Sequence, residues 1–582
     1  MSPAYSCTEM QGYAVPVGKH VEDPPADAGK VLAFPGGRIS TAAKILMTTG
    51  SNSGSHFSVL AKVATALVER GHTVTALISD AYADKAKESK YAEFKFDIFH
   101  ESDIDLSRQW PAMYANYLIS KKVSFFANLF KWKPPAVTSL LRNCKDMIDH
   151  FVGKTVQYDL FMLDGHSPCS VFLAGRLNIP YIILIPSGIK PSLARRHGIP
   201  DTSTYYPEMS TGLSHRMGFF QRVSNTITAF CEDAVVFFEY DMLSFILSFQ
   251  FNVETPIRTL LADAQLVLVN SDFAVDFPFP LQPNVVTVGG LTTRPSQPLT
   301  PDWEELVRSA GRNGVVLFTL GTYSASILTL ETMEKFVRAF AALPQLVVWQ
   351  MQDEPPASLQ LSDNIRIVSW MPQNDLLGHS SLKALVFHGG NNGMYEALYH
   401  GVPMVVMPLI YDHPDVAARV VDRGMGVVVD FFSFTIVDLT VAIHQVITDP
   451  RYRENTQRVS AIFKAHPQPP LERAAFWIEH VLKYGGDYLR SSRTDLYIWQ
   501  VYSLDVYAFL LLLVYLSYRV LKFCVVRRYH RGLLAAIFAC LKIPLRCICP
   551  LRLRKVIGNH ISWPVARGLW KRSSSSTDNI KV

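Results

Sequence analysis

The sequence predicts an α/β fold with two Rossmann-like domains, followed by a C-terminal transmembrane helix. Both halves of the chain contain short apolar runs, typical of buried parallel strands, which alternate with segments of helical period. The 582 residues, 49% of them hydrophobic and 12% aromatic, suffice for two domains with buried sheets. A long apolar run begins after Asp505. Together these observations favour a globular protein attached to a membrane.

The N-terminal half opens with a β-α-β pattern. The predicted elements are, in order, a strand at 44–49, a Ser/Gly turn at 50–55, a helix at 57–70 closed by Gly71, and strands at 73–79, 159–163 and 181–186. We assign residues 43–293 to this first domain and leave residues 1–42 unassigned. A proline-rich linker at 294–303 separates it from a second domain at 301–485.

Two side chains of the first domain follow predicted strands. His56 lies where the first loop meets its helix, and Asp164 follows the strand at 159–163. The carboxyl ends of parallel strands share one edge of a sheet, where open α/β sheets bind ligands. An imidazole titrates near neutral pH, so the position of His56 suits a general base. His166 is a local rival, His72 is typical of a cation that ends a helix, and Asp159 is a weaker rival because it begins its strand.

The second half contains a candidate phosphate site. An apolar strand at 384–387 leads into His388, Gly389 and Gly390, and Asn391 with Asn392 is predicted to cap a helix at 393–400. Gly401 ends this helix, and a second strand at 402–409 ends just before Asp412 and His413. Glycines let the backbone approach a phosphate closely, and the free N–H groups of the helix start favour negative charge. A pyrophosphate is the natural ligand of such a site.

The spacing of the polar residues in this half resembles the signature of the UDP-glycosyltransferase family. The matching residues are Trp370, Gln373, His388, Gly390, Asn392, Glu396, Asp412 and His413. The resemblance implies the family's GT-B fold, in which two Rossmann-like domains face each other across a cleft. It also implies a UDP-sugar as co-substrate, with no permanently bound cofactor. A late helix of the family returns to the first domain, and residues 471–482 could form it here.

The resemblance implies a role for each matching residue. Trp370 would stack on uracil, Gln373 would bond to the base or ribose, and Glu396 would accept from the ribose hydroxyls. His388, Gly390 and the amides near Asn392 would hold the diphosphate.

Two more residues of the signature would bind the transferred sugar. Asp412 and His413 would bond to its hydroxyls. Thr322, which follows another predicted strand, resembles the family's phosphate-side hydroxyl.

In the family, a histidine after the first strand and an aspartate at a later strand end form the catalytic pair. His56 and Asp164 match these positions. The carboxylate would fix the tautomer of the imidazole and stabilise the imidazolium as it forms. The expected reaction is a direct displacement at the anomeric carbon with inversion.

No metal site is expected. The one Asp-x-Asp triplet, Asp103–Asp105, lies far from the nucleotide signature, and Cys144, Cys169 and Cys231 lack the spacing of paired ligands.

The acceptor and the sugar are less defined. Aromatic, apolar stretches at 107–147 and 191–251 could form the wall of a pocket for lipophilic alcohols, or be ordinary core or membrane-facing surface. His413 stands where most family members carry Gln, which resembles the ceramide galactosyltransferase branch. Galactosyl transfer to ceramide-type lipids is therefore an alternative to glucuronosyl or glucosyl transfer. A catalytically silent, membrane-anchored binding protein is a further alternative, against which the presence of both His56 and Asp164 argues.

The C-terminal region has the properties of an anchor. We predict a transmembrane helix at 504–526, because Arg519 and Lys522 can extend to the headgroups. The net charge is modestly basic, +6, and much of the basic charge collects after Leu504, so it indicates no nucleic-acid surface. Positive charge beyond the span predicts a basic cytosolic tail at 527–582 and catalytic domains across the membrane.

The cysteines of the tail and the start of the chain leave alternatives. Four of the eight cysteines lie between Cys524 and Cys549, which suits either an acylated interfacial helix or an unstructured tail. Residues 1–41 lack the apolar segment of a signal peptide. Either the start is misassigned, or the catalytic domains are cytosolic. We expect the first, and hence a single-pass protein of the endoplasmic reticulum with lumenal domains. A homo-oligomer is compatible with the sequence.

Overall fold

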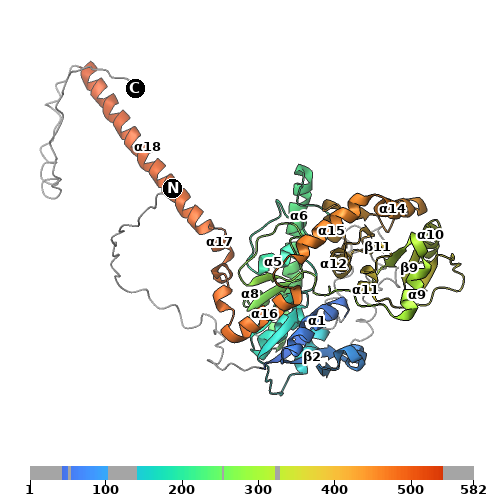
Figure 1. Ribbon diagram of the computed structural model, residues 1–582. Helices are drawn as coiled ribbons and strands as arrows, with labels where there is room; N and C mark the ends of the chain where they lie inside the picture. Colours follow the sequence, from blue (N-terminus) through green and yellow to red (C-terminus); the bar gives the residue numbers. More distant parts are fainter. Residues whose placement is uncertain are drawn as a thin grey trace, which may run out of the picture. The chain divides into compact units, whose positions relative to one another are not determined.

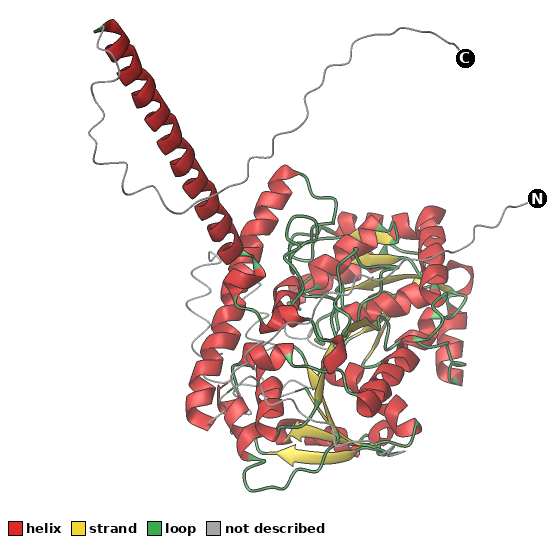
Figure 2. Ribbon diagram, turned by 90° about the vertical axis from the view of Figure 1, so that its left-hand side faces the viewer, coloured by secondary structure: helices red, strands yellow, loops and turns green. Residues whose placement is uncertain are grey.

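A computed structural model describes residues 42–49, 54–102, 141–251, 255–321, 328–409 and 411–541 (Figure 1). The chain divides into two compact units, Met1–Thr494 and Asp495–Val582. The first unit contains two parallel β-sheets with helices on both faces (Figure 2). The expected α/β class with two Rossmann-like sheets is therefore confirmed.

The first sheet has seven parallel strands in the order β3-β2-β1-β4-β5-β6-β7. Its strands are β1 (Lys44–Thr48), β2 (Thr73–Ser79), β3 (Lys95–Phe99), β4 (Leu160–Asp164), β5 (Tyr181–Ile185), β6 (Leu266–Val269) and β7 (Val285–Thr287). The helices with this sheet are α1 (Ser55–Glu69), α4 (Pro168–Leu177), α5 (Pro191–Arg196), α6 (Phe219–Val236), α7 (Leu243–Phe251) and α8 (Ile257–Ala262). Short 3-10 turns occupy Asp80–Lys87 and Ser89–Tyr91, and a π-helical segment, η3 (Phe237–Met242), joins α6 to α7. The central strands β4 and β5 are fully buried apolar runs, as covered parallel strands require, whereas the edge strand β3 is largely exposed or half-buried.

The second sheet has six parallel strands in the order β10-β9-β8-β11-β12-β13. Its strands are β8 (Val315–Thr319), β9 (Leu346–Gln350), β10 (Ile365–Val368), β11 (Leu382–Phe387), β12 (Met404–Val406) and β13 (Gly426–Val428). The helices are α9 (Pro301–Ser309), α10 (Leu330–Ala341), α11 (Gln373–Leu377), α12 (Asn391–His400), α13 (His413–Asp422), α14 (Ile436–Thr448) and α15 (Pro450–Lys464), with a 3-10 turn at Gly311–Asn313.

The helix after the Gly-Gly pair differs from the prediction. We expected Asn391 and Asn392 to cap a helix at 393–400, but α12 begins at Asn391 and its N-cap residue is Gly390. The side-chain amide of Asn391 instead donates to the carbonyl of Asn270 in the first domain, at 3.0 Å. A tertiary contact has therefore replaced the local cap, which sequence pattern alone does not reveal.

Helix α16 (Pro470–Tyr484) returns to the first domain, as we expected for residues 471–482. Its buried residues Ala474, Ile478 and Val481 belong to the same apolar core as α1 and the first sheet. On the surface of this packing, Arg70, the C-cap residue of α1, donates to Glu479 at 2.8 Å. The end of the second domain is thereby attached to the first.

The described part of the second unit contains α17 (Ile498–Val501) and α18 (Leu504–Cys540), which follow 3-10 turns at Asp487–Leu489 and Ser492–Asp495. Helix α18 has 37 residues and is long and apolar enough to cross a membrane. The predicted span at 504–526 lies within it, and the helix continues past Arg527 and Arg528. The expectations for residues 1–41 and 542–582 lie outside the described residues.

Candidate active site

His56 and Asp164 lie side by side at the carboxyl edge of the first sheet. Asp164 is the last residue of β4, and His56 is in the first turn of α1, directly after β1. Strands β1 and β4 are neighbours, which brings residues 108 positions apart together. His56 Nδ1 and Asp164 Oδ2 are 2.6 Å apart. The Asp164 side chain is 3% exposed and that of His56 37%, so the imidazole is partly accessible while its partner is enclosed.

Each residue of this pair favours the charged form of the other. Burial alone would lower the pKa of His56, but the Asp164 carboxylate and the hydrogen bond outweigh it, and the net shift is upward. Burial would raise the pKa of Asp164, yet His56 and His166 hold it well below its usual range. When Asp164 is ionised and His56 is neutral, the carboxylate accepts a hydrogen bond from the Nδ1–H group of His56. The unprotonated Nε2 of the imidazole is then free to accept a proton.

The three rivals have other contacts. His72 Nδ1 accepts from the backbone N–H of Ala43 at 3.1 Å, and Asp159 accepts from that of Lys44 at 2.7 Å, so both hold the start of β1. His166 remains near the site: its Nδ1 lies 3.4 Å from Asp164 Oδ1, and its Nε2 lies 3.2 Å from Ser187 Oγ.

The two histidines and Asp164 therefore form one cluster. The ligand atoms of His56, Asp164 and His166 lie within 4.8 Å of one another. That spacing would also suit a cation, although we expected no metal site. The Asp103–Asp105 triplet lies outside the described residues.

On the opposite domain, His388 is enclosed at the end of β11. Its ring packs edge-on against that of His413, with ring centroids 4.7 Å apart. Burial, with a smaller contribution from His413, lowers the pKa of His388 to about 3, so this imidazole is neutral. A Cβ at Gly390 would lie 2.5 Å from its Nε2, and one at Gly321 would lie 2.8 Å from its Cε1. Both glycines are required by the packing around His388.

The residues expected at the nucleoside end also come together in part. Gln373, the first residue of α11, donates to Glu396 of α12 at 2.7 Å. Burial raises the pKa of Glu396 to about 7. Trp370 follows β10 and is 67% exposed, so its ring is available for stacking. Thr322 lies outside the described residues.

Asp412 and His413 open helix α13 and face the first domain. Burial lowers the pKa of His413 to about 3 and raises that of Asp412. The charges of Asp412 and His56 influence each other's titration, although the two residues come from different domains. The proposed sugar-binding end of the second domain therefore reaches the His56–Asp164 pair.

Several contacts that hold the domains together were not predicted. Asp415 accepts from the backbone N–H of Ser210 at 2.8 Å and of Gly212 at 3.1 Å. Arg419, one turn later in α13, forms a buried ion pair with Asp276 of the first domain. No local pattern marks these residues, because their partners are more than 140 positions away.

A small cavity of about 20 Å³ lies at this junction. Residues of both domains line it, among them Ser187, Tyr206, Asp412, Asp415 and Arg419. Asn270, just after β6, adds a further link, since its side-chain amide approaches Asn392 Oδ1 at 3.4 Å. The two domains therefore meet beside the His56–Asp164 pair.

A disulfide joins Cys144 and Cys169. From the sequence we expected only that these cysteines are scattered and do not act as metal ligands. Cys144 lies in the helix of residues 141–149 and Cys169 in α4, five residues after Asp164. Both are buried in the core of the first domain.

Comparison with known proteins agrees with the fold. The family model described as "UDP-glucoronosyl and UDP-glucosyl transferase" matches residues 43–534. UDP-glucuronosyltransferase 2C1 of Oryctolagus cuniculus is 38% identical over 412 residues, covering 70% of this chain and 80% of that protein. UDP-glucuronosyltransferase 2B7 of Homo sapiens is 34% identical over 489 residues, covering 79% and 88%.

Solved structures show the same fold at low identity. The glycotransferase of kitacinnamycin superposes with a TM-score of 0.54 at 20% identity, covering 76% of this chain and 99% of its own. Os79 from O. sativa gives 0.54 at 16% identity, covering 75% and 99%. The fold is therefore GT-B, and the chain belongs to the UDP-glucuronosyl and UDP-glucosyl transferase family as a UDP-glycosyltransferase.

Proposed function

We propose that this enzyme transfers a hexosyl group from a UDP-sugar to a hydroxyl group of a lipophilic acceptor, with inversion and without a metal. The observation that carries the proposal is the 2.6 Å contact of His56 with Asp164, at the point where Asp412 of the second domain reaches the first. A base with a carboxylate partner is what a weakly acidic hydroxyl needs.

In the proposed reaction, Nε2 of His56 takes the proton of the acceptor hydroxyl as its oxygen attacks the anomeric carbon. The new carbon–oxygen bond forms while the bond from that carbon to the UDP oxygen breaks, and UDP leaves with the electron pair. Asp164 stabilises the resulting imidazolium. The charge that develops on the diphosphate would be stabilised by donors around His388, Gly390 and Asn392.

The donor would lie along the second domain. We assign uracil to Trp370, the base or ribose to Gln373, and the ribose hydroxyls to Glu396, whose carboxyl contacts Gln373. Asp412 and His413 would bind the sugar, and Thr322 would bond to the phosphates. Because His413 replaces a residue that is Gln in most of the family, galactosyl transfer to ceramide-type lipids is the alternative for donor and acceptor.

The proposal is tested by UDP release from UDP-glucuronate, UDP-glucose and UDP-galactose with a panel of phenols, sterols and ceramide. The wild-type enzyme should turn over at least one pair, and His56→Ala should lower kcat by about 10²–10⁴-fold while UDP still binds. His72→Ala is the matched control, because it also removes an imidazole of the first domain, but one whose contact is with the backbone at the start of β1. Equal turnover by His56→Ala would refute the assigned base.

We further propose that the first unit lies in the lumen of the endoplasmic reticulum, with α18 as the single membrane span. The Cys144–Cys169 disulfide supports this, since disulfides persist in oxidising compartments and are rare in the cytosol. Protease treatment of sealed microsomes should leave the first unit intact and remove only the tail. Digestion of the first unit in sealed microsomes would place it in the cytosol.

A further inference from the structure

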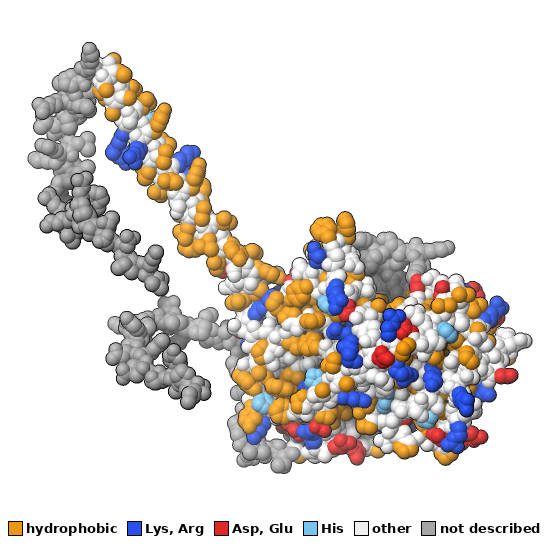
Figure 3. All heavy atoms as spheres, turned by 45° about the horizontal axis from the view of Figure 1, so that its top comes forward, with side chains coloured by type: hydrophobic (Ala, Val, Ile, Leu, Met, Phe, Trp, Pro, Cys, Tyr) orange, Lys and Arg blue, Asp and Glu red, His pale blue; other side chains and the backbone are white. Residues whose placement is uncertain are grey.

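Two histidines and a carboxylate gather at one point of the first domain. Elsewhere histidines are scattered over the surface, as Figure 3 shows for one face of the molecule. Among the described residues, His56, Asp164 and His166 form the one group of three His, Cys, Asp or Glu side chains whose ligand atoms lie within 4.8 Å of one another. Imidazole nitrogens and carboxylate oxygens are common ligands of zinc in proteins.

His166 contributes a buried nitrogen that the His56–Asp164 pair does not use. Its Nδ1 lies 3.4 Å from Asp164 Oδ1, and within the described residues this Nδ1 has no hydrogen-bond partner. The ring is tilted against that of His56, with ring centroids 5.3 Å apart. A buried polar atom without a partner is costly, so a group that bonds to this Nδ1 would be stabilised there.

The hydroxyl of Ser187 determines which nitrogen of His166 carries the proton. This hydroxyl donates its one hydrogen to the carbonyl of Gly188 at 3.4 Å, so its oxygen accepts from Nε2–H of His166, 3.2 Å away. In the neutral ring, Nδ1 then presents a lone pair to the Asp164 carboxylate. A hydrogen bond at the far nitrogen is also what orients a histidine toward a metal ion. The arrangement therefore favours a cation beside Asp164.

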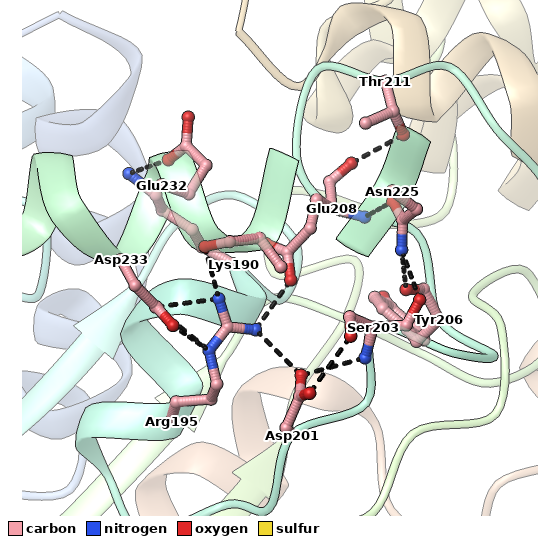
Figure 4. Close-up of polar contacts among 11 residues, drawn as sticks. Lys190, Arg195, Asp201, Ser203, Tyr206, Glu208, Thr211, Asn225, Glu232 and Asp233 are labelled. Atoms are coloured by element: carbon pink, nitrogen blue, oxygen red, sulfur yellow. Dashed lines mark hydrogen bonds and ion pairs between the residues drawn. The ribbon is translucent and has the colours of Figure 1, made fainter. Parts of the chain in front are cut away.

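The cluster lacks a cationic side chain of its own. Within the described residues, the ion-pair partners of Asp164 are the two histidines, and no lysine or arginine pairs with it. The network around Arg195 of α5 is different, because its guanidinium binds the carboxylates of Asp201, Glu208 and Asp233 (Figure 4). Those carboxylates are already neutralised, whereas Asp164 can still accept a metal cation.

We propose that His56, Asp164 and His166 bind a Zn²⁺ ion, and that this ion blocks the proposed base. Tetrahedral zinc with bonds of about 2.0–2.2 Å places its ligands roughly 3.3 Å apart, which matches the separation of His166 Nδ1 and Asp164 Oδ1. His56 Nδ1 must move back from its 2.6 Å contact with Asp164. Its place in the first turn of α1 and its partly exposed side chain allow this movement. The inference rests on the proposed role of His56.

The block follows from the position of the His56 proton. In the proposed reaction, Nδ1–H of His56 donates to Asp164, and Nε2 takes the proton of the acceptor hydroxyl. When zinc binds Nδ1, the single proton of the neutral ring resides on Nε2 instead. No lone pair then remains at Nε2, so the acceptor hydroxyl keeps its proton. Zinc should therefore lower kcat.

The ligands select among divalent ions. Two imidazoles and one carboxylate suit zinc, whereas magnesium prefers oxygen ligands and retains its waters. Asp412 of the second domain adds a carboxyl group whose charge influences that of both histidines, which favours a cation. Magnesium at the concentration at which zinc inhibits should therefore have no effect.

Binding is tested on the full chain in detergent, without donor or acceptor, after removal of metal with a chelator. Co²⁺ is the probe, because its visible absorption is strong in tetrahedral sites and weak in water. The wild type should bind one Co²⁺ with this absorption, and Zn²⁺ should displace it. His166→Asn keeps an amide near the Nδ1 position but removes the metal ligand. Its affinity for Co²⁺ should fall by about tenfold or more.

His100 provides the matched control. It is an exposed imidazole whose Nδ1 lies 2.7 Å from Asp80 Oδ2, so the same change there removes a histidine beside a carboxylate, but from a pair with only two ligands. His100→Asn should bind Co²⁺ like the wild type. The thermal midpoint of each variant shows whether it is folded.

Turnover measures the block of the base. With the most active donor–acceptor pair, zinc should lower the kcat of the wild type and of His100→Asn, and excess chelator should restore it. His166→Asn should need about tenfold or more zinc for equal inhibition. Each variant is compared with its own rate before zinc is added. Zinc held by the UDP-sugar affects all three proteins equally.

The outcomes separate the metal site from the block. A wild type without the Co²⁺ absorption, or a folded His166→Asn that binds Co²⁺ as tightly, would overturn the site. Co²⁺ and Zn²⁺ binding with undiminished turnover would refute the block, and zinc that raises turnover would also replace the metal-free scheme. A wild type that turns over no donor–acceptor pair would refute the proposed function and with it the block, while Co²⁺ binding would still decide the metal site.

Discussion

At the scale of single residues, the site depends on partners that fix the state of each titratable group. His56 keeps a raised pKa because Asp164 outweighs burial, whereas burial lowers the pKa of His388 and of His413 to about 3, so both stay neutral. The sequence predicted that His56 and Asp164 lie close together, because Asp164 ends one strand of the first sheet and His56 opens the helix that follows a neighbouring strand. It did not predict that His166 shares the same carboxylate.

The state of His56 leads to a prediction on pH. The base must be neutral, so kcat/KM should fall as the pH drops through a pKa above the usual value of about 6.5. In Asp164→Asn the raising charge is lost while burial remains, so the acid limb should move to lower pH and kcat/KM should fall by about 10⁴-fold. A profile of kcat/KM against pH measures both. An acid limb that stays in place in Asp164→Asn would contradict the assigned partner.

The glycine before α12 leads to a second prediction. Gly390 has φ −65°, so Gly390→Ala causes no backbone strain, and its effect is the collision with the His388 ring. Because the His388 ring is enclosed, it must shift to make room for the added methyl group. We therefore expect the affinity for UDP to fall about tenfold or more, and the overpacking to cost roughly 1–3 kcal/mol of stability.

The control for Gly390→Ala lies in the same helix. Gly393→Ala meets its nearest atom at 3.3 Å, on Phe387, and should change UDP affinity little. Calorimetric titration with UDP measures both variants. Equal losses would mean that the approach to His388 is not the cause.

At the scale of elements, helix α13 connects the donor residues to the first domain. The helix begins at His413. Asp415 accepts hydrogen bonds from the backbone of Ser210 and Gly212. Arg419 forms an ion pair with Asp276. The strands and helices were predictable from their apolar periodicity. The start of α12 was wrong by two residues, because Asn391 bonds to Asn270 rather than capping its own helix.

The Arg419–Asp276 pair leads to a third prediction. Arg419→Met leaves the Asp276 carboxylate buried without its cation, which should cost about 3–5 kcal/mol and raise the KM for the UDP-sugar by displacing α13. Asp276→Asn in the same chain removes the uncompensated charge, so the double variant should recover part of the stability. Thermal midpoints and KM values of the four proteins measure the coupling. Strictly additive losses would show that the pair is not coupled.

At the scale of the whole molecule, the proposed reaction depends on two sheets meeting at their carboxyl edges. The proposed base comes from the first domain and the proposed donor site from the second, and α16 packs back against the first domain. The arrangement places Asp412 beside His56 without any sequence proximity. In the proposed scheme, fixed donors stabilise the charge on the leaving diphosphate, so the scheme uses no metal.

That scheme leads to a fourth prediction, on metal removal. Incubation with a chelator, followed by transfer into metal-free buffer, should leave kcat and KM unchanged within about a factor of two. The cluster of His56, Asp164 and His166 makes this a stringent test, since its geometry could hold a cation. Loss of activity that returns with an added divalent ion would replace the metal-free scheme with a metal-assisted one.

The sequence by itself determined the alternation of strands and helices, the nucleotide signature and the apolar C-terminal helix. These properties are local, because periodicity, turn residues and spacing act over a few tens of residues. Tertiary structure alone decided the Arg419–Asp276 pair, the Cys144–Cys169 disulfide and the outward face of α6. The aromatic stretch of 191–251 could have formed core, pocket or surface. Which of its faces is buried depends on where Arg195 and its neighbours lie after packing, and no local pattern records that.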